Sequence, residues 1–174
     1  MKIKIDIYRS KAYYAAFMGI FLAIAVALTT IESMFSSFLP LGMRIGLANI
    51  VIMMVFILAD KKSAFILVLL KSLFVFLTRG VTAGGMSFCG GILAFFVLLI
   101  LLEKTKSSYI LISVLSSVAH SMGQLVLSCI ITSSINVLFY APMLIISSTV
   151  AGICTGIVLN VILPHIYVTK SECK

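Results

Sequence analysis

The sequence predicts an all-α membrane protein, folded as a single bundle of six transmembrane helices. Hydrophobic residues make up 62% of the 174 residues and charged residues only 10%, whereas soluble domains carry roughly 25% charge. Apolar runs alternate with short connections that are polar or rich in glycine. A chain of this length accommodates about six spans of roughly 20 residues, which leaves no room for a separate soluble catalytic domain.

Six apolar runs define the expected spans, all within one transmembrane domain that covers residues 1–174. They are 12–31, 45–59, 63–78, 86–102, 109–132 and 142–164. The second is the least regular, because its helix would extend only about 22 Å against a hydrocarbon core of roughly 30 Å. We expect it to begin earlier, near Leu41, or to be tilted or broken. The first run is longer than the core of a secretory signal, so we expect it to stay as a helix.

The basic residues predict which helix ends face the cytoplasm. If both termini are inside, cytoplasmic segments hold ten of the thirteen Lys and Arg residues, and the opposite orientation would leave only three inside. The ten are Lys2, Lys4, Arg9, Lys11, Lys61, Lys62, Lys104, Lys106, Lys170 and Lys174. This positive-inside pattern predicts a multi-pass protein of the bacterial cytoplasmic membrane with both termini cytoplasmic.

Several kinds of site are not indicated. The cysteines (Cys89, Cys129, Cys154, Cys173) have no CxxC spacing, so they predict neither a zinc site nor a disulfide framework. The net charge of +8 is not gathered into a patch with interleaved aromatics, as nucleic-acid binding would require. We therefore expect no metal, no cofactor and no nucleic-acid partner. The sequence also lacks a glycine-rich phosphate-binding loop with its lysine, so we expect no ATP hydrolysis by this chain alone.

Four charged residues are not explained by topology, namely Glu32, Arg44, Lys71 and Arg79. Lys71 lies about 10 Å from the outer end of its expected span, where an unpaired ammonium is costly, so we expect it to be buried in the bundle. It is either a ligand contact, a snorkelling side chain or a structural partner of Glu32. Arg79 is either an interfacial anchor or a ligand contact, and Arg44 either a solvated loop charge or part of a cover over the site. Three cations against one carboxylate favour an anionic or phosphorylated ligand.

A polar pair is expected on the fifth span. His120 and Gln124 are spaced i, i+4, so they share one helix face. Such a pair serves either as an interhelical hydrogen bond or as a ligand contact. A lone histidine does not predict a metal site.

Small residues form two regular faces. The first span carries Ala15, Gly19, Ala23 and Ala27 at i+4 spacing, with Ala12 and Ala16 on an adjoining ridge. The sixth span carries Ser148, Gly152, Gly156 and Asn160. Each face allows close helix packing, either within the bundle or against a partner, and we expect one of them to pack internally. A glycine cluster around the third connection predicts a tight turn, a bend or a gate, and consists of Gly80, Gly84, Gly85, Gly90 and Gly91.

Three segments resemble a known family. PLGMRIGLANIVIMMVFILAD, LLKSLFVFLTRG and SVLSSVAHSMGQLVLS, in this order, are similar to heptaprenyl diphosphate synthase component I, also called the Gx transporter family. The resemblance covers about residues 40–156. It implies kinship with the substrate-binding S components of energy-coupling-factor (ECF) transporters, which are six-helix proteins whose first helix presents an AxxxA face to a coupling subunit. Lys71 stands where we expect the family to have arginine, which weakens the case for bidentate phosphate recognition.

The resemblance implies a substrate-binding subunit that takes up a small anionic, isoprenoid-linked or vitamin-like compound, together with a transmembrane coupling subunit and cytoplasmic ATPases. The candidate ligand contacts are Glu32, Arg44, Asn49, Lys71, Arg79, His120 and Gln124. Gly46 and Gly123 are carried over with the matching GLAN and AHxxGQ stretches, and the candidate partner contacts are Ala12, Ala15, Ala16, Gly19, Ala23 and Ala27.

Two other functions stay open. The chain could be an accessory membrane subunit of prenyl diphosphate or quinone biosynthesis, or an assembly protein whose buried polar residues only hold helices together. We expect no enzymatic activity of its own, because prenyl diphosphate synthases bind magnesium through clustered aspartates. The two aspartates of this chain, Asp6 and Asp60, lie in separate segments.

Overall fold

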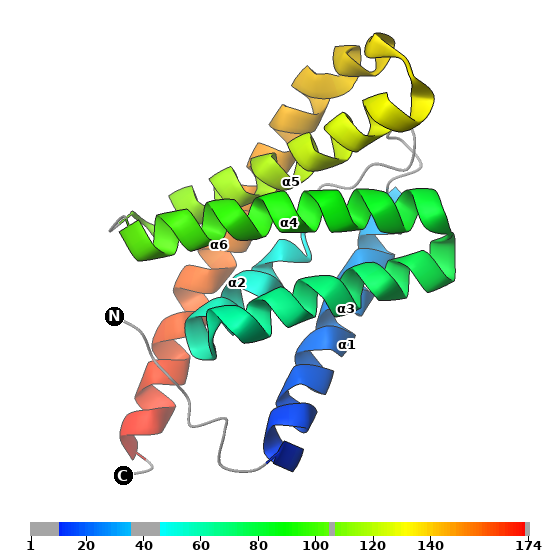
Figure 1. Ribbon diagram of the computed structural model, residues 1–174. Coiled ribbons are helices and arrows are strands. Elements are labelled where there is room, and N and C mark those ends of the chain that lie inside the picture. Colours follow the sequence, from blue (N-terminus) through cyan, green and yellow to red (C-terminus); the bar gives the residue numbers. More distant parts are fainter. Residues whose placement is uncertain (1–10, 36–45, 105–106, 173–174) are drawn as a thin grey trace.

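Six α-helices form the described part of the protein, residues 11–35, 46–104 and 107–172 of a computed structural model (Figure 1). The helices are α1 (Lys11–Phe35), α2 (Asn49–Leu58), α3 (Lys61–Arg79), α4 (Val81–Lys104), α5 (Tyr109–Thr132) and α6 (Ala141–Glu172), with the short 3-10 helix η4 (Ile135–Tyr140) before α6. Four segments are long and apolar enough to cross a membrane, namely Lys11–Met34, Val81–Lys104, Tyr109–Thr132 and Ile135–Pro164. This confirms an all-α membrane protein.

The second helix is shorter than the expected span of residues 45–59. It has ten residues, which extend about 15 Å. The chain turns just before it, because Gly46 has a φ of +93° and its carbonyl accepts a hydrogen bond from Asn49 N at 2.9 Å. A positive φ of this size suits glycine. The first residues of the apolar run therefore form a turn, and α2 begins only at Asn49.

The same short helix forms the centre of the bundle. Eight of its ten residues are buried, and it contacts all five other α-helices. Its apolar side chains pack with Leu67 of α3, Leu98 of α4, Ile112 of α5 and Leu159 of α6. A helix that is hydrophobic on every side is expected to be buried in this way.

Helices α1 and α3 contact each other near both of their ends. Tyr14 Oη and Ser63 Oγ are 3.1 Å apart where α1 and α3 begin. Near their other ends, Arg79 Nη2 donates to Ser33 Oγ. These contacts place α1 and α3 in parallel, and α4 returns along α3 after a turn at Gly80, which has a φ of +87°.

The glycine cluster proves to be a packing feature. Only Gly80 lies in the connection, and α4 already begins at Val81, five residues before the expected span. A Cβ atom at Gly84, Gly90 or Gly91 would lie within 3.0 Å of a neighbouring helix. Of the three alternatives expected for this cluster, the tight turn is present at Gly80. The other four glycines lie inside α4, and three of these let α4 approach its neighbours.

The two small-residue faces behave differently. On α6, a Cβ at Gly152 would lie 2.5 Å from Val114 Cα, and one at Gly156 would lie 2.6 Å from Ile110 Cα, so this face packs internally against α5. On α1, a Cβ at Gly19 would meet nothing within 4 Å. We call this face of α1 the α1 ridge. Its residues are all exposed, namely Ala12, Ala15, Ala16, Gly19, Ala23 and Ala27.

Gly152→Ala is expected to destabilise the protein by about 1–3 kcal/mol, the usual cost of overpacking, because the new methyl group would collide with the backbone of α5. Gly19→Ala is the matched control, and we expect it to be neutral or to stabilise α1 by about 0.5–1 kcal/mol. Thermal unfolding of the two variants in detergent micelles measures the difference. Equal melting temperatures would contradict the assignment of the α6 face to internal packing.

Candidate ligand-binding site

The buried face of α5 is mainly polar. Seven of its ten buried residues carry polar side chains, namely Ser113, Ser116, Ser117, His120, Ser121, Gln124 and Ser128. Two serines lie in interhelical contacts, since Ser113 Oγ is 2.5 Å from Thr155 Oγ1 on α6 and Ser116 Oγ donates to Ala94 O on α4 at 3.4 Å. Polar groups buried inside a membrane bundle need hydrogen-bond partners. The other polar residues of this face, around His120 and Gln124, therefore mark a candidate site.

His120 and Gln124 form the middle of this face. Both are buried, and Gln124 Nε2 lies 2.7 Å from His120 Nε2. An amide nitrogen can only donate, so the imidazole accepts at Nε2 and, when neutral, carries its proton on Nδ1. The expectation that the two side chains share one face is confirmed.

Glu32 links α1 to the beginning of α2. Its side chain is buried, and Oε1 accepts hydrogen bonds from Gly46 N and, at 3.2 Å, from Leu47 N. Ala48, at the N-cap position of α2, makes no side-chain capping bond. The first N–H groups of α2, from Asn49 to Val51, donate to the carbonyls of residues 46–48. The carboxylate therefore holds the turn that precedes α2, and its negative charge lies near the positive end of the α2 dipole.

Asn49 is the residue that most directly indicates a ligand. Its side chain is 4% exposed, and neither Oδ1 nor Nδ2 has a hydrogen-bond partner within the described residues. A Cβ at Gly46 would lie 3.2 Å from Asn49 Nδ2 and equally far from His120 Cδ2, so the amide and the imidazole flank the same glycine. Leaving a buried polar group unsatisfied costs about 1–3 kcal/mol. A bound molecule that hydrogen-bonds the amide would remove this cost.

Lys71 is 3% exposed, which confirms its expected burial. The adjacent Ser72 Oγ lies 4.0 Å from the Cβ position of Gly91, and the Cβ position of Gly90 lies 2.9 Å from His120 Nδ1. Lys71 and His120 are therefore at about the same level of the bundle, on two helices that both contact the paired glycines of α4. A buried ammonium inside a membrane bundle is a candidate functional group by default.

A family model for heptaprenyl diphosphate synthase component I matches residues 21–162. The chain belongs to this family. The match includes the whole cluster just described, from Glu32 to Gln124, and confirms the resemblance drawn from the sequence. No curated protein and no solved structure matches the chain.

In this member of the component I family, Arg79 does not join the buried cluster. It is exposed at the end of α3, eight residues after Lys71, which corresponds to about 12 Å along the helix. Arg44 lies outside the described residues. Among the described residues, the buried cluster holds the Lys71 ammonium and the Glu32 carboxylate. The Arg79 guanidinium donates to Ser33 Oγ, next to Glu32 in sequence, and the expected excess of positive charge stays a prediction.

Gly90 belongs to the site but was not among the expected contacts. A Cβ at this position would lie 2.7 Å from His120 O and 2.9 Å from the imidazole ring. Only glycine lets α4 come this close to His120. In the sequence, the adjacent glycines 90 and 91 inside an apolar run indicate a close approach of two helices. The same pair is equally typical of a tight connection.

Glu32→Ala is expected to lower the free energy of unfolding by about 1.5–3 kcal/mol, because the backbone N–H groups of Gly46 and Leu47 lose a charged acceptor. Glu103→Ala serves as the control, since Glu103 forms an exposed ion pair with Lys61 at 3.3 Å and such pairs contribute about 0–1 kcal/mol. Denaturant titration in micelles compares the two. A smaller loss for Glu32→Ala than for Glu103→Ala would contradict the role of Glu32 in holding the turn before α2.

Proposed function

We propose that this chain is the ligand-binding membrane subunit of a multi-subunit uptake transporter, similar to the S components of ECF transporters. The observation that carries the proposal is the buried side-chain amide of Asn49, which lies beside His120. Neither polar atom of this amide has a hydrogen-bond partner within the described residues. A protein that only holds its helices together gains nothing from such a group. A protein that binds a hydrogen-bonding solute does.

The ligand is a small molecule that offers both donors and acceptors. Asn49 presents a carbonyl and an amide, Gln124 an amide and Lys71 an ammonium. An anionic, isoprenoid-linked or vitamin-like compound with several polar atoms fits this set. The ammonium would meet an acidic group of the ligand, while the side-chain amides would read its neutral polar atoms.

The α1 ridge supports a membrane partner. Its small residues are exposed, and Gly19 has open space around it, so another helix can approach the backbone closely. The partner is a transmembrane coupling subunit that transmits work from cytoplasmic ATPases, which this chain needs because its sequence has no phosphate-binding loop. In this account the chain makes six membrane segments in the bacterial cytoplasmic membrane, with α2 as the short one and both termini inside.

A second candidate function is supported by the family's description, which names a component of heptaprenyl diphosphate synthase. In that case the chain would be an accessory subunit that holds a prenyl lipid for a soluble catalytic partner. Such a partner would dock at the cytoplasmic helix ends, around Lys62 and Lys104, and would not need the α1 ridge.

Site-specific photo-crosslinking in cells of the source organism distinguishes the two partners. A benzophenone amino acid is placed at Gly19 on the ridge, at Lys62, or at Ile146, which is an exposed control position on α6. The transporter proposal expects an integral membrane protein crosslinked from Gly19 and from neither of the other positions. A soluble prenyl synthase crosslinked from Lys62, with nothing from Gly19, would support the accessory function and overturn the first proposal.

A further inference from the structure

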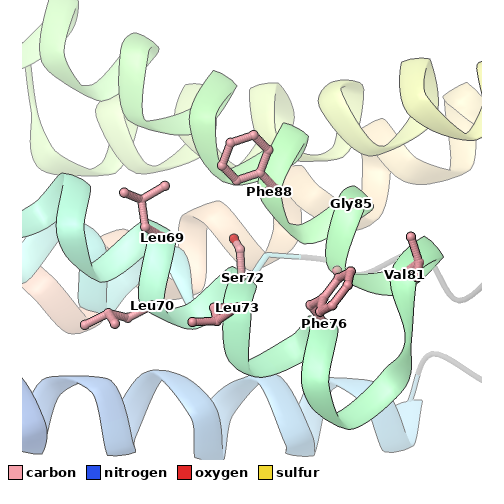
Figure 2. Close-up of a pocket in the computed structure, with 9 residues that line it drawn as sticks. Leu69, Leu70, Ser72, Leu73, Phe76, Val81, Gly85 and Phe88 are labelled. Carbon is pink, nitrogen blue, oxygen red and sulfur yellow. The ribbon is translucent and has the colours of Figure 1, made fainter.

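Helix α1 lies at the edge of the bundle, where it runs beside α3 (Figure 2). Only 17% of its most apolar stretch is buried, against 50% of that of α5. The α1 ridge is exposed, whereas Asn49, His120 and Gln124 of the candidate site are buried. A partner on the ridge therefore acts on the site through the contacts that α1 makes with the rest of the bundle.

Glu32 is the buried side chain by which α1 reaches the ligand site. Its Oε1 accepts hydrogen bonds from Gly46 N and Leu47 N, which lie 14 and 15 residues later in the sequence. The carbonyl of Gly46 in turn accepts a hydrogen bond from Asn49 N, at 2.9 Å. Gly46 thus joins Glu32 to Asn49 by one hydrogen bond on each side. A Cβ at Gly46 would lie 3.2 Å from both Asn49 Nδ2 and His120 Cδ2, so the same residue borders both site side chains.

The turn at Gly46 depends on this carboxylate. Gly46 has a φ of +93°, and glycine adopts positive and negative φ about equally readily, so sterics alone do not select the observed conformation. Hydrogen bonds to a charged acceptor are worth about 1.5–3 kcal/mol, which is enough to select it. A movement of α1 that withdrew Glu32 would release the turn and shift Asn49 relative to His120.

We propose that Glu32 is a positioning residue that couples the α1 ridge to the ligand site, so that a partner on the ridge and a ligand on Asn49 strengthen each other's binding. A bound ligand fixes the start of α2 and with it the turn that Glu32 holds. A bound partner fixes α1 and with it the position of Glu32. Whichever binds first removes part of the ordering that the second requires, and such coupling is reciprocal. This inference rests on the proposed transport function, which supplies the partner.

A neighbouring contact of α1 provides the control. Ser33 Oγ accepts a hydrogen bond from Arg79 Nη2, which ties the same turn of α1 to the end of α3. This contact does not pass through Gly46. Ser33→Ala therefore loosens the outer end of α1 and leaves the link from Glu32 to Asn49 in place.

A double-mutant cycle measures the coupling, with the yield of the partner crosslink from a benzophenone amino acid at Gly19 as the readout. The variants are expressed in cells of the source organism, and each yield is divided by the amount of monodisperse protein recovered from the membrane. With Glu32 intact, Asn49→Leu is expected to lower the yield about fivefold, the lower end of typical coupling between sites. In the Glu32→Ala background the yield is already low, and Asn49→Leu should not lower it further.

Two conservative variants separate the coupling from a general loss of stability. Glu32→Gln keeps a carbonyl acceptor and should retain most of the effect of Asn49→Leu, whereas Glu32→Asp keeps the charge, is one methylene shorter and should lose it. Ser33→Ala should leave the effect at about fivefold. An effect of Asn49→Leu that is equal in the Glu32→Ala and wild-type backgrounds, or absent from the wild-type background, would overturn the coupling and leave the transport function standing. A wild-type protein that gives no crosslink from Gly19 would overturn both.

Discussion

Replacement of Asn49 by leucine is expected to abolish ligand-dependent stabilisation and to raise the melting temperature of the ligand-free protein. The two side chains are similar in size, and leucine removes an amide that has no hydrogen-bond partner within the described residues. Relief of an unsatisfied buried polar group is worth about 1–3 kcal/mol. Thermal unfolding in micelles, with and without small molecules extracted from the wild-type protein, measures both effects.

Asn160→Leu is the matched control for this substitution, because Asn160 is an exposed asparagine on α6. It should leave the ligand-dependent shift intact. If Asn49→Leu lowered the melting temperature of the ligand-free protein and preserved the shift, the amide would be a structural group and the site would lie elsewhere.

Gly90→Ala is expected to cause the second large effect, a loss of about 1–3 kcal/mol in stability together with loss of the ligand-dependent shift. The added methyl group would lie 2.7 Å from the carbonyl oxygen of His120 and 2.9 Å from its ring, so α4 and α5 must move apart at the site. The same thermal assay, supplemented by circular dichroism to show retained helix, measures both losses.

Gly85→Ala, five residues earlier on the same helix, controls for the change in helix propensity. Its new methyl group would meet only the end of the flexible Leu127 side chain, at 3.2 Å. We expect a change within about 1 kcal/mol, since relaxation of Leu127 and the better helix propensity of alanine oppose each other. A Gly90→Ala variant as stable as Gly85→Ala, and still responsive to ligand, would contradict the close approach of α4 to the site.

Hydropathy predicted six α-helices, which the described residues contain, because long apolar runs have few alternatives to membrane helices. Four segments of the described residues are long and apolar enough to cross a membrane. Hydropathy could not predict where α2 begins. Apolar character continues across Gly46, and the turn there depends on a backbone angle and on two hydrogen bonds to Glu32, which lies 14 residues earlier. Hydropathy does not register either feature.

The features of the candidate site that depend on neighbouring positions in one helix were predictable from the sequence. The shared face of His120 and Gln124 follows from helical spacing, and the burial of Lys71 follows from the cost of a charge in lipid. The unsatisfied amide of Asn49 and the contact between Gly90 and His120 depend on how separate helices pack together. No spacing along the chain reveals such features. Arg79 is exposed at the end of α3, which is compatible with both of its expected roles, an interfacial anchor and a ligand contact.

Native mass spectrometry of the gently purified protein tests the central claim most directly, that the cluster around Asn49, His120 and Gln124 holds a small molecule. The wild-type protein and the Asn160→Leu control should each retain an adduct of one defined mass, and Asn49→Leu should be bare. A wild-type protein that is bare under the mildest conditions, or the same adduct on wild type and Asn49→Leu alike, would contradict the claim.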